Sequence, residues 1–399
     1  MEKGVAKVLL MLLIASLAAW EGVDSRKTSA AWKGVDSRRS EAADEYELKR
    51  PSVMPSREPV KIIKTQEGDV IDCVHIYAQP AFDHPLLKDH VIKTRPRGIE
   101  TKPRVGGRPH SHGADFKEDE QECPQGTIPI LRLPKRHAFN HTSYPKTLTA
   151  PSNSQDYREF AVVRGNYVHG YGLFGVSGYL NVWNPPTEMN EYSASRIIVL
   201  SGTSDGQLYE DHILAGWIVF PSRFSDTQTR FYTHWQGNGA GCFDFDCPGF
   251  MQVSPKHILG KLLSVSTYQG DQAQLLVRIF KAQEDGNWWL QVEDTMIGYW
   301  PSSLFPYLSW WANNTEWGGE ILNTWPGGSR SKTLMGSGHP WIEEYGRAAY
   351  ISSMNYVNGD NHLKDPTFVT SFVTNADYNE LGNYEDKDSM GHHIYFGGP

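Results

Sequence analysis

The feature that most constrains the fold is a series of short β-rich runs between residue 157 and the C-terminus. Gly, Pro, Asn and Asp separate these runs, and no long segment with a helical period of apolar residues lies among them. Many short strands with turn signals between them are typical of one antiparallel β-sandwich or barrel. The runs are residues 159–165, 177–183, 195–202, 213–220, 230–235, 249–253, 262–268, 274–280, 287–292 and 348–357. We therefore expect an all-β domain over residues 157–399.

The N-terminal residues 1–19 have the pattern of a secretory signal peptide. Lys3 and Lys7 precede an apolar run over residues 8–14, and small residues follow it. The run is short for a membrane span, which needs about 20 residues. The pattern predicts a secreted protein (extracellular, cell wall or vacuole) with no membrane segment after signal removal.

Three further segments precede the β-rich region. Residues 20–51 contain the tandem copies "AWEGVDSR" and "AWKGVDSR" in a polar context, which predicts a disordered linker. Residues 52–135 form a smaller block that contains a Gly- and Pro-rich stretch and ends at Lys135-Arg136. The dibasic pair fits a processing site and fits an ordinary surface pair equally well. Residues 136–156 then read as a second linker.

Charge and cysteine usage narrow the class of function. The formal net charge is -8, which argues against nucleic acid as a partner. Four cysteines fit an oxidising compartment. Cys242 and Cys247 are close enough for a local disulfide, which leaves Cys73 to pair with Cys123. A metal site at "GCFDFDC" is the alternative, but no second Cys or His pair lies nearby, and we expect no metal or cofactor.

Two sequons agree with export. Asn140 and Asn313 each begin an Asn-X-Thr acceptor sequence for N-glycosylation. His110 and His112 lie in the Gly- and Pro-rich stretch, where solvated loop histidines are the expected reading. No nucleophile elbow of a serine hydrolase is present.

Carboxylates beside aromatic residues are the better lead to chemistry. Glu320 follows "EWGG", Glu191 precedes a β-rich run, and Asp226, Glu293 and Asp294 lie in turns next to aromatic runs. Two carboxylates in one cleft push their pKa values apart, so that one acts as a base and the other as an acid. A solvated loop charge is the ordinary role of each of these residues, and the sequence does not say which of them meet.

From "SGYLNVWNPP" onward, the chain resembles the plant neprosin family of glutamic peptidases. The matching motifs include "NEYSASRIIVLSG", "AGWIVFPSRFSDTQTRFYTHW", "GCFDFDCPGFMQV", "IGYWPSSLF", "EWGGEILN" and "MGSGHP". The stretches "VIDCVHIYAQPAFDHPLLKDH" and "CPQGTIPILRLPK" resemble the activation-peptide region of the same family. The resemblance covers roughly residues 60–399 and consists of many motifs in the same order.

The resemblance implies a zymogen in which a smaller propeptide domain precedes an antiparallel β-sandwich of two sheets. It implies hydrolysis of peptide bonds after proline at acid pH by two glutamates, on a peptide or protein substrate. One catalytic glutamate of the family ends the "WGGE" motif, which is Glu320 here. Gly318 and Gly319 would then let the substrate backbone pass close, and Trp317 would form part of the cleft wall.

The second glutamate of the family stands just before "AGW", where this chain has Leu214. A leucine can neither transfer a proton nor stabilise an oxyanion. Glu210 has the same strand parity but would lie about 13 Å away along an extended strand. Asp211 has the wrong parity unless a bulge intervenes. Glu191, in a neighbouring motif, is the candidate substitute, and strand-edge hydrogen bonding is its alternative role.

Three functions compete on these observations. The first is a secreted endopeptidase, and the second is a non-catalytic relative that binds Pro-rich peptides or wall components, which Leu214 favours. The third is carbohydrate binding by the many aromatic residues, since Tyr and Trp stack on sugars as well as on proline rings. The sequence predicts the fold more firmly than the activity.

Overall fold

A computed structural model describes residues 46–97, 112–113, 122–134, 157–166, 172–202, 211–256, 259–325, 331–366, 369–376, 380–384 and 390–398. The chain divides into two compact units, residues 1–46 and 47–399, and every helix and strand named below belongs to the second. The expected signal peptide, both copies of the tandem duplication, Lys135-Arg136, His110 and Asn140 lie outside the described residues.

A small antiparallel sheet forms the N-terminal block of the second unit. Its strand order is β1 (Lys61–Lys64), β2 (Val70–His75) and β4 (Thr127–Leu131). Three short 3-10 helices follow β2, at Ile76–Ala78, Pro80–Asp83 and Pro85–Leu87. A disulfide joins Cys73 in β2 to Cys123, the pair expected once Cys242 and Cys247 are joined to each other.

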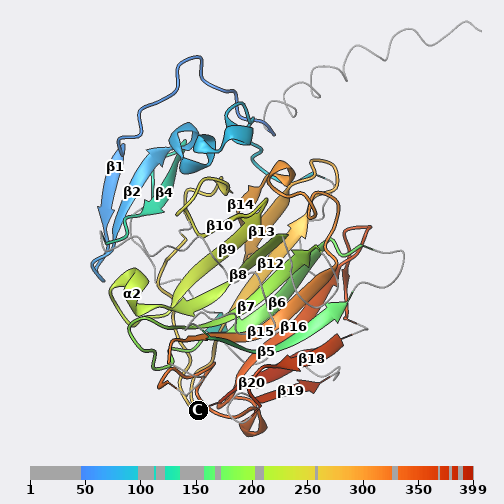
Figure 1. Ribbon diagram of the computed structural model, residues 1–399. Helices are drawn as coiled ribbons and strands as arrows, with labels where there is room; N and C mark the ends of the chain where they lie inside the picture. The colour runs from blue at the N-terminus through green and yellow to red at the C-terminus, as the bar shows by residue number, and fades with distance from the viewer. Residues whose placement is uncertain are drawn as a thin grey trace, which may run out of the picture. The chain divides into compact units, whose positions relative to one another are not determined.

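A seven-stranded antiparallel sheet carries the motifs of interest (Figure 1). Its strand order is β10 (Ala240–Phe243), β9 (Arg230–Gly237), β8 (Asp211–Val219), β7 (Tyr192–Ser201), β15 (Asn314–Asn323), β5 (Tyr157–Asn166) and β18 (Val369–Val373). Helix α2 (Pro221–Phe224) connects β8 to β9. Most of these strands coincide with β-rich runs of the sequence.

The second large sheet is built from the remaining strands. Its order is β11 (Met251–Gln252), β14 (Thr295–Trp300), β13 (Trp288–Val292), β12 (Ala273–Lys281), β6 (Gly175–Asn181), β16 (Ala349–Val357), β20 (His393–Gly397) and β19 (Glu380–Tyr384), with β17 (Leu363–Lys364) on β16 and β3 (His112–Gly113) on β12. The 3-10 helices η4 (Ser302–Leu304) and η6 (Trp341–Glu343) lie in its connections.

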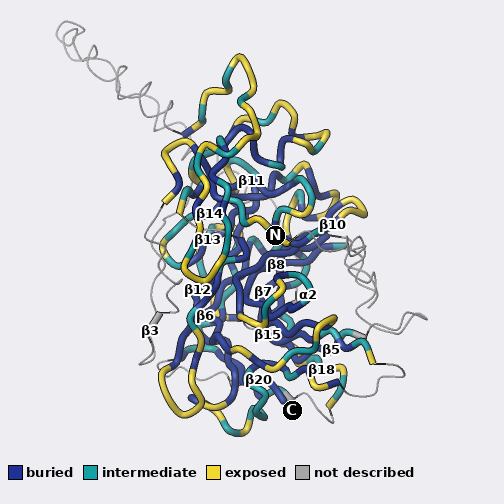
Figure 2. Tube along the Cα trace, turned by 90° about the vertical axis from the view of Figure 1, so that its left-hand side faces the viewer, coloured by how far each residue is buried: buried dark blue, intermediate teal, exposed yellow. Residues whose placement is uncertain are grey.

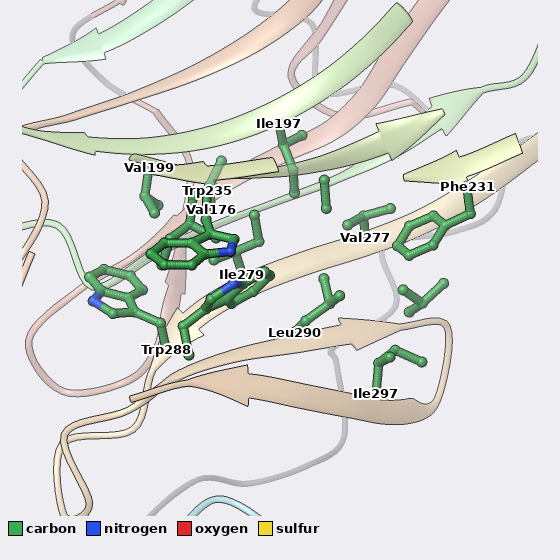
Figure 3. Packing of buried hydrophobic residues seen from close by; sticks show 14 of the residues in the cluster. Val176, Ile197, Val199, Phe231, Trp235, Val277, Ile279, Trp288, Leu290 and Ile297 are labelled. Carbon is green, nitrogen blue, oxygen red and sulfur yellow. The ribbon is translucent and has the colours of Figure 1, made fainter. Parts of the chain in front are cut away.

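One hydrophobic core joins the inner faces of the two large sheets (Figure 3). Ile197 and Val199 of the seven-stranded sheet pack with Val277 and Ile279 of the other sheet. The central strands are buried along their whole length, as Figure 2 shows in dark blue. The structure thus confirms the expected all-β sandwich of two antiparallel sheets with a smaller N-terminal block before it.

One expected strand is absent. Residues 262–268 make backbone hydrogen bonds to three different segments, such as Leu263 N to Thr229 O and Ser266 N to Val182 O. A residue run with high strand propensity forms no β-ladder when its backbone amides bond to several different segments instead of to one neighbouring strand. Within the part of the chain that is described, no helix is long and apolar enough to cross a membrane.

Polar contacts fasten the N-terminal block to the sandwich. The guanidinium of Arg230 in β9 forms two bonds to Asp69, at 2.9 and 3.0 Å. The imidazole of His90 hydrogen-bonds the hydroxyl of buried Tyr299 in β14 at 2.8 Å. We call this set of contacts the seam. Separation of the two parts at the seam would remove these partners of Arg230 and Tyr299, which are both buried.

Candidate active site

Strand β15 sorts its side chains onto two faces because successive residues of a strand point in opposite directions. Trp317 and Ile321 point between the sheets and belong to the main core. Glu316 and Glu320 point to the opposite face, which we call the outer face of the seven-stranded sheet. Both glutamates are almost fully buried in the full chain, with 0 and 1% of their surface exposed.

The carboxylate of Glu320 is held by three side chains from two neighbouring strands. Arg196 of β7 donates from Nε to Oε2 at 2.8 Å. Arg158 of β5 forms an ion pair from Nη1 to Oε1 at 3.1 Å, and the hydroxyl of Tyr192 donates to the same oxygen. The antiparallel register sets Glu320 beside Ala194 of β7, so that Tyr192 and Arg196 flank it on the outer face.

These contacts decide the protonation state of Glu320. Burial raises its pKa, but the charges of Arg158 and Arg196 and the hydrogen bonds from Tyr192 and Arg196 lower it further, so the pKa lies below its ordinary value. The carboxylate therefore stays ionised at acid pH values at which an ordinary glutamate takes up a proton.

Arg196 also links Glu320 to the second glutamate of the strand. Its Nη2 lies 3.0 Å from Oε2 of Glu316, and Nε of Arg164 lies 2.6 Å from Oε1 of that residue. Three guanidiniums and two carboxylates thus alternate as Arg164–Glu316–Arg196–Glu320–Arg158 across β5, β15 and β7, and we call this set the ionic ladder. Its formal charge is +1, so Glu320 lies in a region of net positive charge on the outer face.

Leu214 lies on the same outer face, in β8. It pairs with Ile198 of β7 and with His234 of β9, and its side chain is fully buried. Its surroundings are a second, smaller hydrophobic cluster on this face: Tyr192, Ala194, Ile198, Leu200, Leu214, Ile218, Phe220, Phe224, Tyr232 and Phe243. A leucine suits this cluster, whereas a carboxylate there would need the guanidiniums of the ladder as partners.

Two histidines adjoin Leu214. His212 lies two residues earlier in β8, and Nε2 of its ring is 2.9 Å from Nδ1 of His234. The rings stack at a centroid distance of 5.0 Å, and His234 meets Phe243 edge-on at 4.8 Å. Burial first, and then the charges of Arg158 and Arg196, lower the pKa of His212 to about 3, whereas Glu320 acts in the opposite direction.

The N-terminal block contributes to the cover of the outer face. Leu131, the last residue of β4, and Leu133 pack against the smaller cluster. The same two leucines line a cavity of about 170 Å³ together with Phe224, Arg223 and Asp244. The apolar part of the outer face is therefore packed against the N-terminal block in the full chain.

Residues 189–399 match the model of the neprosin domain, and residues 62–166 match that of the neprosin activation peptide. The chain belongs to the neprosin family. The chain is also similar to a crystal structure of scytalido-glutamic peptidase with a transition state analog inhibitor. The match covers 61% of this chain and 100% of the peptidase chain, at 10% sequence identity and a TM-score of 0.36.

Three expectations for the "WGGE" motif of this neprosin domain are wrong. Trp317 does not wall an outer cleft, because strand alternation turns it into the core, where its Nε1 donates to Ser177 O at 2.9 Å. A Cβ on Gly318 would lie 2.2 Å from Ala161 O, and one on Gly319 would lie 2.6 Å from the ring of Phe396. The glycines therefore admit the protein's own strands, not a substrate backbone.

Other candidate carboxylates of the neprosin domain have structural partners. Glu191 precedes β7 on the parity opposite to Tyr192, and it accepts hydrogen bonds from Thr324 N and from the hydroxyls of Thr324 and Thr333. This arrangement favours the strand-edge role for Glu191.

The remaining candidates likewise lie away from the ionic ladder. Asp211 accepts the backbone N–H groups of Tyr307 and Leu308, and Asp226 pairs with Arg230 at 2.7 Å. Glu293 accepts the N–H of Leu276, Asp294 lies in the turn between β13 and β14, and Glu210 is outside the described residues.

The sequence interpretation missed Glu316, Arg158, Arg196 and Tyr192. A signal for Glu316 was present, because it lies four residues before Glu320 and shares its strand face. The pairing of β15 between β5 and β7 supplies the arginines, and that strand order is not visible in the spacing.

The remaining site predictions have simple outcomes. Cys242 and Cys247 form the expected disulfide. Among the described residues, no group of three or more His, Cys, Asp or Glu side chains is placed to hold a metal ion. Asn313 is half-buried and accepts a hydrogen bond from Ser201 at 2.6 Å, and its glycosylation remains a prediction.

Proposed function

We propose that this protein is a glutamic endopeptidase, made as an exported zymogen, that cleaves peptide bonds after proline at acid pH. The observation that carries the proposal is the buried carboxylate of Glu320, which two arginines and a tyrosine hold ionised on the outer face. The match to the neprosin domain and to its activation peptide supports the reaction class and the zymogen form.

Glu320 is the general base of the proposed reaction. Its carboxylate takes a proton from a water molecule while the water oxygen attacks the carbonyl carbon of the scissile bond. General bases contribute about 10²–10⁴-fold to such rates. Because the pKa of Glu320 is lowered, the base stays in its active form well into the acid range, and activity falls only when pH drops through that lowered pKa.

The guanidinium of Arg158, with its five N–H donors, is the group beside Glu320 that can stabilise the oxyanion, whereas the single hydroxyl hydrogen of Tyr192 is donated to Glu320. Charged donors placed where negative charge develops lower the barrier strongly. Phe160 and Phe372 pack together at 6.4 Å next to the ladder, and flat apolar rings of this kind suit a proline ring. Export is supported by two disulfides, which persist in oxidising compartments.

Leu214 favours the alternative, a non-catalytic relative that binds Pro-rich peptides. Its buried apolar setting supplies no second carboxylate beside Glu320. One experiment separates the two functions. The secreted full-length chain is incubated at acid pH and then assayed with a quenched proline-containing peptide between pH 2.5 and 7, beside Glu320→Gln and Leu214→Glu.

We expect acid-dependent cleavage that Glu320→Gln lowers by about 10²–10⁴-fold. Silence from the natural chain, with cleavage appearing only in Leu214→Glu, would establish the binding protein instead. Cleavage that Glu320→Gln leaves intact would refute the role of Glu320.

A further inference from the structure

The proposed reaction needs a second proton-carrying group, because the amine that leaves the scissile bond must take up a proton. Leu214 occupies the family position for that group. Glu316 is the nearest other carboxylate of the strand, but Arg164 and Arg196 engage both of its oxygens. An anion held between two guanidiniums suits the role of a base, as proposed for Glu320, and not the role of the proton donor.

The hydrogen-bonded pair of His212 and His234 lies on the same outer face and on both sides of Leu214. His212 lies two residues before Leu214 in β8 and so shares its face, and His234 of β9 is the cross-strand partner of Leu214. The two nitrogens 2.9 Å apart share one hydrogen, since one ring donates and the other accepts. The pair can therefore bind one additional proton, directly beside Leu214, which occupies the position of the family carboxylate.

The pair is coupled to the ionic ladder. The charged groups that act on His212 are Arg158 of β5, Arg196 of β7 and Glu320 of β15, and the ring that faces His234 from β10 is that of uncharged Phe243. Burial, and then the charges of the two arginines, lower the pKa of His212 to about 3. An imidazole in this setting takes up an extra proton only at acid pH and gives it up readily.

We propose that the His212–His234 pair is the second proton carrier of the site. The pair takes the role of the family glutamate at the position that Leu214 occupies. This inference rests on the proposed function. The pair, carrying one extra proton, gives it to the nitrogen of the scissile bond as the C–N bond breaks and the carbonyl re-forms. Glu320 holds the proton taken from water and returns it through solvent to the pair, so that one water is consumed and both groups are restored.

The test compares the natural chain with His212→Gln and His234→Gln, each alone and each combined with Leu214→Glu, with His339→Gln as the matched control. His339 is partly exposed and bonds Glu343 in a connection of the other sheet. The readouts are kcat and KM for the quenched proline-containing peptide across pH 2.5 to 7.

We expect each histidine variant to lose about 10²–10⁴-fold in kcat with little change in KM. The limb of the pH profile on which activity falls with rising pH should disappear, because that limb reports the proton donor. Leu214→Glu should restore at least tenfold in either histidine background, since it returns a proton carrier to the site. His339→Gln should behave as the natural chain.

A natural chain that cleaves while both variants keep its kcat and pH profile would overturn the inference and leave the proposed function standing. A loss of kcat that Leu214→Glu does not restore would also overturn it, because a purely structural pair gives that result. A silent natural chain would overturn the proposed function and this inference together. If the glutamine variants are not secreted, His234→Phe repeats the test with the aromatic packing on Phe243 preserved.

Discussion

Acidification should loosen the N-terminal block through His90. When the ring is neutral, its Nε2 can accept from the hydroxyl of Tyr299, whose oxygen also accepts the N–H of Lys93 at 3.0 Å. A protonated ring can no longer accept from that hydroxyl, and it would place its positive charge in a half-buried setting near the charge of Lys93. Burial, and then the charge of Lys93, lower the pKa of His90 to about 4.

The sign and size of the effect follow from this pKa. A histidine that leaves the seam regains its ordinary pKa near 6.5, so the separated form binds the proton more tightly. The contribution of His90 to docking is therefore intact above pH 6.5 and is lost progressively as pH falls to 4. The difference in pKa corresponds to at most about 3 kcal/mol, and the partial exposure of the ring reduces this value.

The assay is the thermal midpoint of unfolding from pH 7 to pH 4, measured in a Glu320→Gln background that lacks the proposed general base. His90→Gln keeps an acceptor for Tyr299 but does not titrate, so its midpoint should fall less with acidification than that of the parent. His362→Gln is the control, because His362 is exposed and lies between β16 and β17 of the sandwich. Parallel pH profiles for the parent and His90→Gln would refute the reasoning.

Two substitutions test the packing around the site. Arg196→Met leaves Glu316 and Glu320 each with one guanidinium fewer in a buried setting, and we expect a loss of about 3–5 kcal/mol in the free energy of unfolding by urea. Gly318→Ala places a Cβ 2.2 Å from Ala161 O at a φ of +148°, and we expect about 3 kcal/mol or more of destabilisation, measured as a fall in the midpoint of thermal unfolding.

Each of these substitutions has a matched control. Arg347→Met removes an exposed guanidinium and should change the free energy of unfolding by less than about 0.5 kcal/mol. Gly346→Ala has a φ of +81° with no atom within 4 Å of the added Cβ, so it should cost only about 1 kcal/mol of backbone strain. Equal losses in a variant and its control would contradict the contacts described for the site.

The sequence predicts the strands of this fold well where the pattern of apolar residues matches a ladder of partners. Residues 213–220 and 274–280 are examples, because both lie in central strands that neighbours bond on either side. The run 262–268 has a similar composition but lies between three segments, and only the tertiary structure decides that.

The candidate site was predictable in part. Alternation along β15 alone places Trp317 and Glu320 on opposite faces, so the error about the cleft wall was avoidable once residues 314–323 were recognised as one strand. The ionic ladder and the histidine pair depend on which strands are neighbours and on their register. Those depend on contacts between residues far apart in the chain, and one sequence does not reveal them.

The disulfide between Cys73 and Cys123 has a consequence for how the N-terminal block can be removed. A single cut anywhere between these residues leaves two fragments joined covalently, so the pieces would separate on a gel only after reduction. Both β2 and β4 would stay in place after such a cut. Only cleavage beyond Cys123, between Leu133 and the start of β5 at Tyr157, separates the whole block from the sandwich.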